Sequence, residues 1–401
     1  MVTRSFDLNH FLKTPRSLFL FGARGVGKST LVRDYVSDKR HLFYNLLETD
    51  TFTRLLRRPD LLRAEIRFTM RDPDPRPLCV VIDEIQKIPP LLDEIHSLIE
   101  QYKASLYFVL TGSSARKLKR SGSNLLAGRA WQVYLHPFTH DEWAIDLEQV
   151  LQIGAIPSVV ADMGHAARTL TAYVGTYLHE EIQQETQVRN LGGFTRFLEV
   201  AAQTHGEPVN FTKIGREVGV STKTVQSYFE ILIDTLVTFQ LPAWHPSVRK
   251  QVQQSPKFYF FDCGVLNALR GDLHATLQPS SYRYGKLFET FFILECFRLN
   301  DYHETGYRFY YWRTNTGQEV DLIVHRGSAR PPLVLEIKSA VSPDRESLKG
   351  LRSFFADNPI CELWVVGQNT VPYMLEDTPV FPWQDALKSI FNDTPNIAQH
   401  K

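Results

Sequence analysis

Near its N-terminus the chain reads Gly22-Ala23-Arg24-Gly25-Val26-Gly27-Lys28-Ser29, followed by Thr30. These residues have the spacing G-x-x-x-x-G-K-[ST]. An apolar segment, 17–21, precedes them and predicts a buried strand, and a helix-forming segment follows from Thr30. In this setting the glycines let backbone N–H groups surround a phosphate, Lys28 reaches the β- and γ-phosphates, and the Ser29 hydroxyl binds Mg²⁺. The run therefore predicts a site for the phosphates of a nucleotide.

Two further apolar segments end in polar residues, as expected for strands that reach such a site. The first, 78–82, is followed by Asp83 and Glu84. Asp83 is placed to hold Mg²⁺ through its water shell, and Glu84 to polarise the attacking water, so the pair predicts hydrolysis of ATP. The second segment, 106–110, is followed by Thr111 and Ser113, and either hydroxyl could sense the γ-phosphate. A polar turn with a capping serine is the simpler alternative.

These motifs resemble those of the AAA-type ATPases, specifically the bacterial and archaeal ATP-binding proteins that join such a module to a C-terminal domain of unknown function. The resemblance implies a parallel-sheet α/β core with Walker A at 22–29, Walker B at Asp83 and Glu84, and sensor 1 at Ser113 or Thr111. It also implies that Arg129 is an arginine finger, which enters the neighbouring subunit's site in a homo-oligomeric ring such as a hexamer. The alternative for Arg129 is an ordinary surface arginine.

Composition sets broad limits on the class of protein. With 401 residues, 43% of them hydrophobic and 22% charged, the chain is expected to be soluble and globular, with room for two or three domains. No segment approaches the roughly 18 to 20 apolar residues of a membrane span, so a cytoplasmic location without membrane partners is expected. The four cysteines show no metal-ligand spacing, which predicts reduced core residues. A net charge of +1 neither requires nor excludes nucleic acid.

The middle of the chain predicts helices and then a DNA-binding motif. Between 141 and 209, apolar residues return every three or four positions, which indicates a helical lid. A short helix at 211–219 and a second helix beginning after Ser221, followed by two strand-like segments, are typical of a winged helix-turn-helix within 210–262.

Suitable DNA contacts lie on the second helix and in the loop of the wing. The groups expected to meet phosphates and base edges are Thr222, Lys223, Gln226, Ser227, Arg249 and Lys250. Between residues 210 and 261 the basic residues outnumber the acidic ones six to three, which favours DNA as the partner. The alternative is that this region serves as a lid or as a docking surface for protein.

The C-terminal third, 263–401, holds a second group of charged residues. Strand alternation at 333–338 places Glu336 and Lys338 on one face, and Asp321, in the preceding strand segment 319–324, would join them across a hairpin. Carboxylate oxygens suit Mg²⁺, and an ammonium group can orient a water or neutralise charge on phosphorus.

This arrangement resembles the PD-(D/E)XK nuclease motif. The resemblance implies that Asp321 and Glu336 are metal ligands with Lys338 beside them. It also implies that Glu289, which matches the glutamate of an upstream helix, belongs to the metal site. Two alternatives remain open: a nuclease-like platform that binds nucleic acid without cutting it, and a chance hairpin.

The sequence thus predicts an α/β fold in four parts. They are a P-loop ATPase core at 1–140, a helical lid at 141–209, a winged helix at 210–262 and a restriction-endonuclease-like domain at 263–401. The predicted function is a Mg²⁺-dependent ATPase that acts on DNA in processing, repair or defence, with a metal-dependent nuclease domain. The alternatives are a motor that moves branched DNA without cutting it, and a nucleotide-dependent switch or scaffold for protein partners that has no DNA activity.

Overall fold

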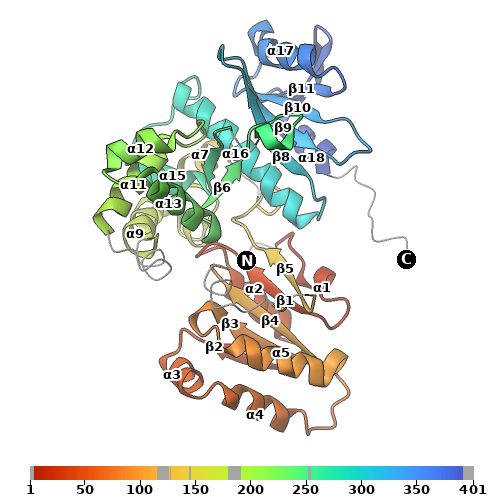
Figure 1. Ribbon diagram of the computed structural model, residues 1–401. Coiled ribbons are helices and arrows are strands. Elements are labelled where there is room, and N and C mark those ends of the chain that lie inside the picture. The colour runs from red at the N-terminus through yellow and green to blue at the C-terminus, as the bar shows by residue number, and fades with distance from the viewer. Residues whose placement is uncertain are drawn as a thin grey trace.

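The computed structural model describes residues 4–114, 126, 128–143, 146–178, 191–251 and 254–391. Its N-terminal part is a five-stranded parallel sheet with the order β2-β3-β4-β1-β5 (Figure 1). The strands are β1 (Ser17–Phe21), β2 (His41–Asn45), β3 (Leu78–Asp83), β4 (Leu106–Gly112) and β5 (Ala130–Tyr134). The predicted parallel α/β core is therefore confirmed.

Helices cover both faces of this sheet, as its sequence requires. Every residue of β1, β3 and β4 is buried, the pattern of parallel strands packed on both sides. Alternate side chains enter two separate cores: Leu18 and Leu20 lie in one, and Phe19 and Phe21 in the other. The helices of this part are α1 (Leu8–Phe11), α2 (Lys28–Val36), α3 (Thr49–Arg57), α4 (Asp60–Thr69) and α5 (Leu91–Tyr102), with short 3₁₀ turns η1 (Ile85–Lys87) and η2 (Lys103–Ser105).

The middle of the chain is mainly helical. Its elements are α7 (Leu147–Ile153), α8 (Pro157–Val160), η3 (Met163–His165), α9 (Ala166–Ala172), η4 (Tyr173–Leu178), α11 (Leu191–Gln203), α12 (Phe211–Val218), α13 (Thr222–Asp234), α14 (Val248–Gln251) and α15 (Cys263–Arg270). Strands β6 (Thr238–Leu241) and β7 (Lys257–Phe260) pair antiparallel. Of the lid predicted at 141–209, residues 144–145 and 179–190 lie outside the described part of the chain.

The helix boundaries around residue 220 follow from their capping residues. The side chain of Asn210 accepts a hydrogen bond from the N–H of Lys213 at the start of α12, and Gly219 ends that helix with φ 76°. The Ser221 side chain then accepts from the N–H of Thr224 and begins α13. Gly219 and Ser221 are the residues from which these helix ends were predicted.

The C-terminal part contains a long helix and a mixed six-stranded sheet with the order β12-β13-β11-β10-β9-β8. Its elements are α16 (Tyr282–Tyr302), β8 (Arg308–Arg313), β9 (Glu319–His325), β10 (Leu333–Ile337), η5 (Arg345–Leu348), α17 (Lys349–Asp357), β11 (Glu362–Gly367), β12 (Tyr373–Leu375), β13 (Thr378–Pro382) and α18 (Trp383–Phe391). Strand β9 runs antiparallel to both of its neighbours, β8 and β10, whereas β10 and β11 are parallel. The predicted hairpin of β9 and β10 is present.

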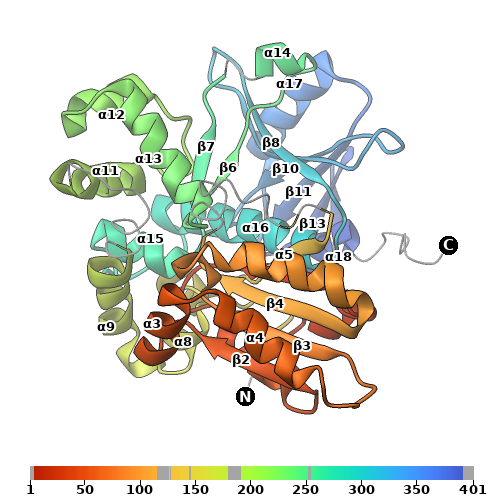
Figure 2. The ribbon, with the colours of Figure 1, turned by 60° about the horizontal axis from the view of Figure 1, so that its bottom comes forward.

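Helix α16 joins the three parts of the molecule. It contacts β5 of the N-terminal sheet, α7 and α15 of the middle region, and β10 and α18 of the C-terminal region, and Figure 2 shows it lying between them. The joint is polar and buried. Arg298 donates to Glu295 and to the carbonyl oxygens of Phe138 and Phe261. Glu295 also accepts from the backbone N–H of His140, so both of its carboxylate oxygens are hydrogen-bonded inside the protein, whereas Nε of Arg298 has no hydrogen-bond partner among the described residues.

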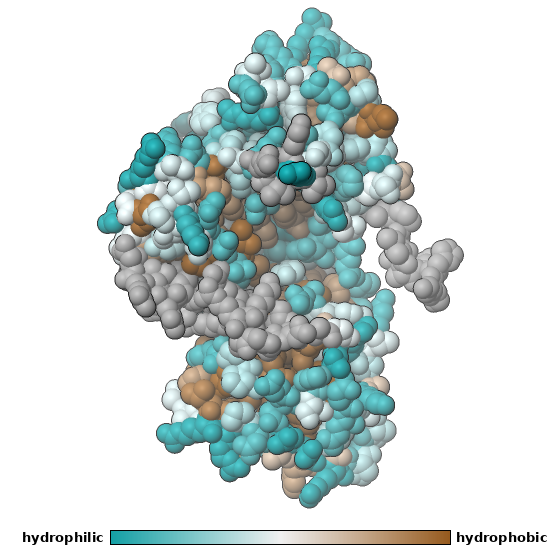
Figure 3. Space-filling view, viewed as in Figure 1, coloured by the Kyte–Doolittle hydropathy of each residue, from teal (hydrophilic) through white to brown (hydrophobic). Residues whose placement is uncertain are grey.

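In Figure 3 the visible side is mainly hydrophilic, with hydrophobic residues in separate patches. Within the described residues, no helix combines the length and the apolar character needed to cross a membrane. The four cysteines, Cys79, Cys263, Cys296 and Cys361, are free thiols, and the first three are buried, as predicted.

We expect Arg298→Met to destabilise the protein strongly. The change leaves the Glu295 carboxylate, which is fully buried, without its arginine, and breaking such a pair costs about 3–5 kcal/mol. Thermal unfolding measures the effect, with Arg58→Met as the matched control because Arg58 pairs with Asp60 at the surface. Equal melting temperatures for Arg298→Met and the wild type would contradict the assigned role of the pair.

Candidate functional site

The glycine-rich run forms a loop between β1 and α2, as the sequence predicts. Gly25 and Gly27 have φ angles of 84° and 93°, a backbone region that favours glycine. A Cβ atom on Gly22 would lie 2.4 Å from the carbonyl oxygen of Leu135. Any residue with a side chain would therefore clash with the backbone at the point where the chain leaves β1. Helix α2 begins at Lys28, which aims the helix N-terminus at the loop.

Lys28 lies on the inner side of this loop. Its ammonium group donates to the carbonyl oxygens of Gly22 at 2.7 Å and Ala23 at 3.1 Å, and the residue is 5% exposed. These contacts hold the lysine against the backbone that the motif assigns to phosphate binding. The structure therefore places Lys28 where the sequence prediction requires it.

Asp83 links the loop to the ends of two neighbouring strands. The Ser29 hydroxyl donates to Oδ2 of Asp83 at 2.7 Å, and the Thr111 hydroxyl donates to Oδ1. Hydroxyl and carboxylate oxygens are the donor types that Mg²⁺ prefers, and here they lie together at the N-terminus of α2. Ser29 and Asp83 thus fit the metal role that the sequence assigns to them.

The structure separates the two hydroxyls that the sequence left as alternatives. Thr111 is fully buried and also accepts from the backbone N–H of Glu84 at 3.1 Å. It therefore hydrogen-bonds both members of the acidic pair from inside the protein. Ser113 lies on the pocket wall together with Lys28 and Glu84. Ser113, which directly follows the end of β4, is therefore the one of these two hydroxyl residues that lines the cavity.

Two adjoining cavities meet at the loop. The first, of about 490 Å³, is the more polar of the two and is lined by Arg24, Gly25, Gly27, Lys28, Ser29, Thr30, Leu47, Glu84, Ser113, Pro157 and Ser158. The second, of about 620 Å³, shares Gly27, Thr30 and Pro157 with the first. Its other lining residues are mostly apolar: Arg4, Val26, Leu31, Asp34, Phe138, Trp143, Val160, Ala161 and Met163. The two cavities together offer a polar and an apolar compartment.

The middle region takes part in this site directly. Pro157 and Ser158 of α8 line the polar cavity, and the Tyr173 hydroxyl donates to the carbonyl oxygen of Arg24 at 3.2 Å. A Cβ atom on Gly25 would lie 3.2 Å from the side chain of Ile156. The phosphate loop is therefore held between the sheet and the helices that follow it.

Arg129 lies away from the phosphate loop of its own chain. It precedes β5, and the first residue of β5, Ala130, is paired with Ser17 at the start of β1, whereas the loop follows the end of β1. The Arg129 guanidinium pairs with Glu100 at 2.5 Å. Within one chain it cannot reach the cavity, so the predicted finger role depends on a second copy.

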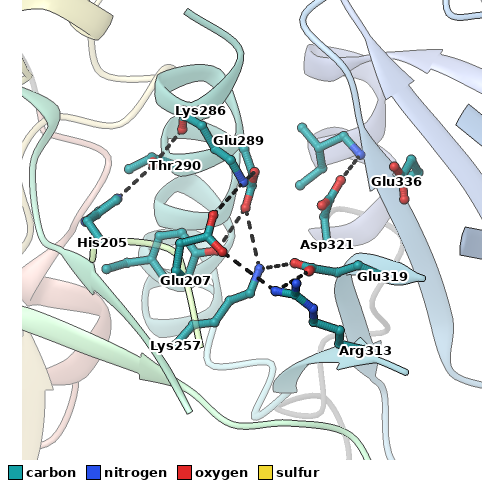
Figure 4. A network of polar contacts seen from close by, with 12 residues as sticks. His205, Glu207, Lys257, Lys286, Glu289, Thr290, Arg313, Glu319, Asp321 and Glu336 are labelled. Atoms are coloured by element: carbon teal, nitrogen blue, oxygen red, sulfur yellow. Dashed lines mark hydrogen bonds and ion pairs between the residues drawn. The ribbon is translucent and has the colours of Figure 1, made fainter. Parts of the chain in front are cut away.

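In the C-terminal part, Asp321 and Glu336 lie together across the β9–β10 hairpin (Figure 4). The register pairs Leu322 with Leu335, which makes Asp321 and Glu336 the next opposing pair. Asp321 accepts from the backbone N–H of Ile337 at 2.8 Å, and Lys338 pairs with Glu336 at 2.5 Å. Burial, together with the charge of Asp321, raises the pKa of Glu336 to about 8. Burial and Glu289 raise the pKa of Asp321 to about 6.

Glu289 belongs to a neighbouring network of ion pairs. It pairs with Lys286 at 3.1 Å, accepts from the Tyr259 hydroxyl at 3.0 Å, and lies 3.9 Å from Lys257. Lys257 is fully buried and pairs with Glu319 at 2.5 Å (Figure 4). Although burial opposes ionisation, the charges of Lys257 and Lys286 hold the pKa of Glu289 below its usual value. Protein cations thus already compensate this carboxylate.

The metal set predicted for this part is only partly assembled. Across the described ranges, no three His, Cys, Asp or Glu side chains are placed to share one metal ion. Two carboxylates, Asp321 and Glu336, do meet, and Oε2 of Glu336 is buried without a hydrogen-bond partner among the described residues. That oxygen could accept a cation or a proton. The fit for Mg²⁺ therefore rests on two carboxylates rather than three.

The predicted DNA-contact residues lie in the first part of α13 and in the short helix α14, which is part of the segment between β6 and β7. Lys223, Gln226 and Arg249 are exposed, and Thr222 and Ser227 are partly exposed, whereas the side chain of Lys250 lies outside the described part. The opposite face of α13 is buried through Val225, Tyr228, Phe229, Ile231 and Leu232. The helix therefore turns its polar face outward.

The loop between β6 and β7 is attached to the C-terminal sheet. The backbone N–H of Trp244 donates to the carbonyl oxygen of Tyr311 at 2.6 Å, and the Trp244 ring packs edge-on against Tyr310. The Tyr311 hydroxyl donates to the carbonyl oxygen of Ser255. The hairpin that was predicted as a wing therefore contacts β8 on one side.

Several residues of these sites escape prediction from sequence. Gln86 contacts both Glu84 and Ser113, and its position two residues after Glu84 is the one local signal for it. The sequence around Lys257 indicates only a strand, yet the ammonium group of this lysine pairs with Glu289 and Glu319 of the C-terminal part. Arg4 and Phe138 line the apolar cavity from segments far apart in the chain, which no local pattern indicates.

Comparisons with known proteins match three families along the chain. Residues 14–144 match the family described as AAA domain, residues 144–275 match a domain of unknown function (DUF8612), and residues 284–386 match another domain of unknown function (DUF4143). The match at 14–144 covers the phosphate loop, Asp83 and Glu84. Together with their geometry, it identifies this part as an AAA-type, nucleotide-binding P-loop ATPase domain.

The chain is similar over three quarters of its length to two mycobacterial proteins. It is 27% identical over 304 residues to uncharacterized proteins Mb2031c of Mycobacterium bovis and Rv2008c of Mycobacterium tuberculosis, covering 75% of this chain and 67% of each relative. Among solved structures, a signal transduction ATPase with numerous domains and a tetratricopeptide repeat sensor, PH0952 from Pyrococcus horikoshii, shows 12% identity and a TM-score of 0.26. That alignment covers 75% of this chain and 45% of the solved one.

We expect Lys28→Ala to weaken nucleotide binding and abolish ATP hydrolysis, and Glu84→Gln to retain binding while losing turnover. Lys28 meets ground-state phosphates, whereas a carboxylate at Glu84 is needed only when water attacks. Nucleotide affinity and phosphate release, measured on the same preparations, separate the two effects. Wild-type turnover in Glu84→Gln would remove that residue from the catalytic role.

Proposed function

We propose that this chain binds ATP with Mg²⁺ at the phosphate loop, hydrolyses it, and uses the nucleotide cycle to act on DNA. The observation that carries the ATPase part is that Lys28, Ser29, Glu84 and Ser113 line one cavity of an AAA domain, with Asp83 hydrogen-bonded to Ser29 behind it. In this assignment Lys28 compensates phosphate charge, Glu84 accepts a proton from the attacking water, and Ser113 donates to the γ-phosphate.

Ser29 and Asp83 would hold the Mg²⁺ ion. The ion supplies charge compensation to the β- and γ-phosphate oxygens when it is bound. Asp83 is kept in place by Thr111, so its carboxylate is oriented before any ligand arrives. This preorganisation favours the assignment, since a fixed carboxylate loses little freedom on binding.

The apolar cavity would take the base of the nucleotide. It opens from the same loop residues as the polar cavity, and Phe138 and Trp143 offer aromatic surface to a purine ring. Arg4 is fixed there by an ion pair with Glu142 and a hydrogen bond to the carbonyl oxygen of His136. The base would therefore contact both the N-terminal segment and α8.

We infer a homo-oligomeric ring, and the placement of Arg129 supports this inference. Because this arginine lies at the opposite end of the sheet from its own phosphate loop, it can serve hydrolysis only in the site of a neighbouring subunit. Leu47, on the wall of the polar cavity, is 58% exposed, which leaves an apolar surface for such a neighbour to cover.

DNA is the proposed partner of the helices around residue 220. The exposed side of α13 begins with Thr222 and Lys223 and continues with Gln226, while α12 adds exposed Lys213 and Arg216. A helix N-terminus flanked by amide, hydroxyl and ammonium groups suits phosphate and base contacts. The buried opposite face of α13 fixes this orientation.

We expect Lys223→Ala to weaken DNA binding and to lower the slope of log affinity against log salt by about one, because one phosphate contact is lost. Binding of the full chain to duplex, single-stranded and branched DNA, measured from low to moderate salt, provides the test. Lys388→Ala removes the same charge from an exposed position on α18 and should leave the slope unchanged. An absence of wild-type binding at every salt concentration would contradict the DNA assignment.

The second candidate function is a nucleotide-dependent switch for a protein partner. It is favoured by the contacts of Tyr173 and Ile156 with the phosphate loop, and by the attachment of the loop between β6 and β7 to β8, which leaves less of that hairpin free to enter a groove. Failure to bind DNA would select this function. ATP-dependent strand movement without cleavage would instead select the branched-DNA motor.

For the C-terminal part we propose metal-dependent DNA cleavage by Asp321, Glu336 and Lys338. Asp321 and Glu336 would hold Mg²⁺, and Lys338, which already contacts Glu336, would compensate phosphate charge. The buried Oε2 of Glu336 without a partner supports a cation at this place. Glu289 would act by orienting Lys286 and Lys257 rather than as a ligand, since these lysines surround it.

We expect Asp321→Asn to abolish cleavage of DNA with Mg²⁺ or Mn²⁺ and to leave ATP hydrolysis unchanged. The asparagine keeps an oxygen for the N–H of Ile337 but loses the charge that a metal requires. Asp385→Asn, on the exposed side of α18, is the matched control. A wild-type protein that cuts no form of DNA with either metal would contradict the nuclease proposal and favour the binding platform.

A further inference from the structure

Gln86 is a buried side chain directly behind the proposed catalytic residues. It lies in the η1 turn, two residues after Glu84, and is 6% exposed. Glu84 and Ser113 line the polar cavity, whereas Gln86 packs between them from the protein side. A polar residue at such a place needs partners of fixed geometry, because an unsatisfied amide inside a protein is costly.

The amide nitrogen of Gln86 supplies two hydrogen bonds. It donates to Oε2 of Glu84 at 2.5 Å and to Oγ of Ser113 at 3.0 Å. A carboxamide nitrogen carries two hydrogens, so both are used. The reverse orientation of the amide would bring its oxygen against the Glu84 carboxylate, which repels it. The partners therefore determine which way the amide points.

Gly112 keeps the amide in this position. A Cβ atom at residue 112 would lie 2.7 Å from the side-chain oxygen of Gln86, well inside contact distance. Gly112 does not have a positive φ, so space for Gln86 rather than backbone conformation explains the glycine. That side-chain oxygen is buried and has no hydrogen-bond partner among the described residues, so the amide is held through its nitrogen.

These bonds set the hydrogen-bonding roles of both cavity residues. Because Oγ of Ser113 accepts from Gln86, its own hydrogen remains available to donate toward a phosphate. Because Oε2 of Glu84 is held, Oε1 remains to accept from water. The backbone of Glu84 is fixed as well: its φ is 64°, an uncommon value for this residue, and its N–H donates to Thr111.

We infer that Gln86 is a positioning residue that couples γ-phosphate recognition by Ser113 to the aim of the Glu84 carboxylate. The inference rests on the proposed ATP hydrolysis. When Ser113 donates to the phosphate, Gln86 keeps Glu84 directed at the attacking water through the same amide nitrogen. Gln86 itself touches neither nucleotide nor water and contributes no group to the reaction.

We expect Gln86→Met to lower kcat for ATP by up to about a hundredfold while KM and nucleotide affinity stay within about threefold. Methionine fills similar space against Gly112 but cannot aim the carboxylate, and a misplaced catalytic group has this order of effect. Gln152→Met is the matched control, since that amide also donates two bonds, to the carbonyl oxygens of Asp272 and Leu273 in the middle region. It should leave kcat unchanged.

A second variant tests the same contact without altering Gln86. Gly112→Ala would push the amide aside and should reproduce the loss of kcat. The coupling to Ser113 is measured by a double-mutant cycle: Ser113→Ala and Gln86→Met together should cost less than the sum of their separate effects, because each breaks the same bond.

The outcomes distinguish this inference from the proposed function. Wild-type turnover that is lost in Glu84→Gln but retained in both Gln86→Met and Gly112→Ala would overturn the role of Gln86 and leave the ATPase assignment intact. Equal losses of nucleotide affinity and kcat in Gln86→Met would also overturn it, since they indicate a general structural role. A wild-type protein without ATP hydrolysis would contradict the proposed function, and the inference with it.

Discussion

The buried pair of Glu295 and Arg298 on α16 is the contact on which the arrangement of the three regions depends. Both charges are almost fully removed from water, so each requires the other and the surrounding hydrogen bonds. Those bonds reach the segment after β5 through Phe138 and His140, and the end of β7 through Phe261. A displacement of α16 from either region would therefore expose an unpaired charge inside the protein.

This joint places the nucleotide cavities next to the rest of the molecule. The segment that α16 binds includes Phe138, which lines the apolar cavity, and Tyr302 of the same helix accepts from the backbone N–H of His136. On the other side, Tyr173 of the middle region contacts the phosphate loop. A nucleotide bound there would touch residues whose positions also determine where the helices and the C-terminal sheet lie. Such shared contacts are the physical requirement for a ligand to alter the balance between two conformations.

The C-terminal carboxylates show how tertiary neighbours change the chemistry of a motif. Asp321, Glu336 and Glu289 would resemble a metal site if they were considered alone. In the folded chain Lys257 and Lys286 compensate Glu289, while Asp321 and Glu336 remain close together with raised pKa values. Lys257 comes from β7 of the middle region, so the electrostatics of this cluster depend on how two regions pack. The two groups are adjacent but differ in charge compensation: lysines lower the pKa of Glu289, whereas burial and neighbouring carboxylates raise the pKa values of Asp321 and Glu336.

The sequence by itself determined the phosphate loop, the acidic pair and the ends of α12 and α13, because each depends on neighbouring residues. A loop that wraps phosphate needs glycine, lysine and hydroxyl at fixed spacing, and a helix begins and ends at its own caps. Tertiary structure alone decided that Ser113 rather than Thr111 faces the cavity, that Gln86 holds Glu84, and that Lys257 enters the C-terminal cluster. It also brought Arg4, Phe138 and Trp143 to one cavity. These outcomes depend on the packing of segments far apart in the chain, which local periodicity and spacing do not encode.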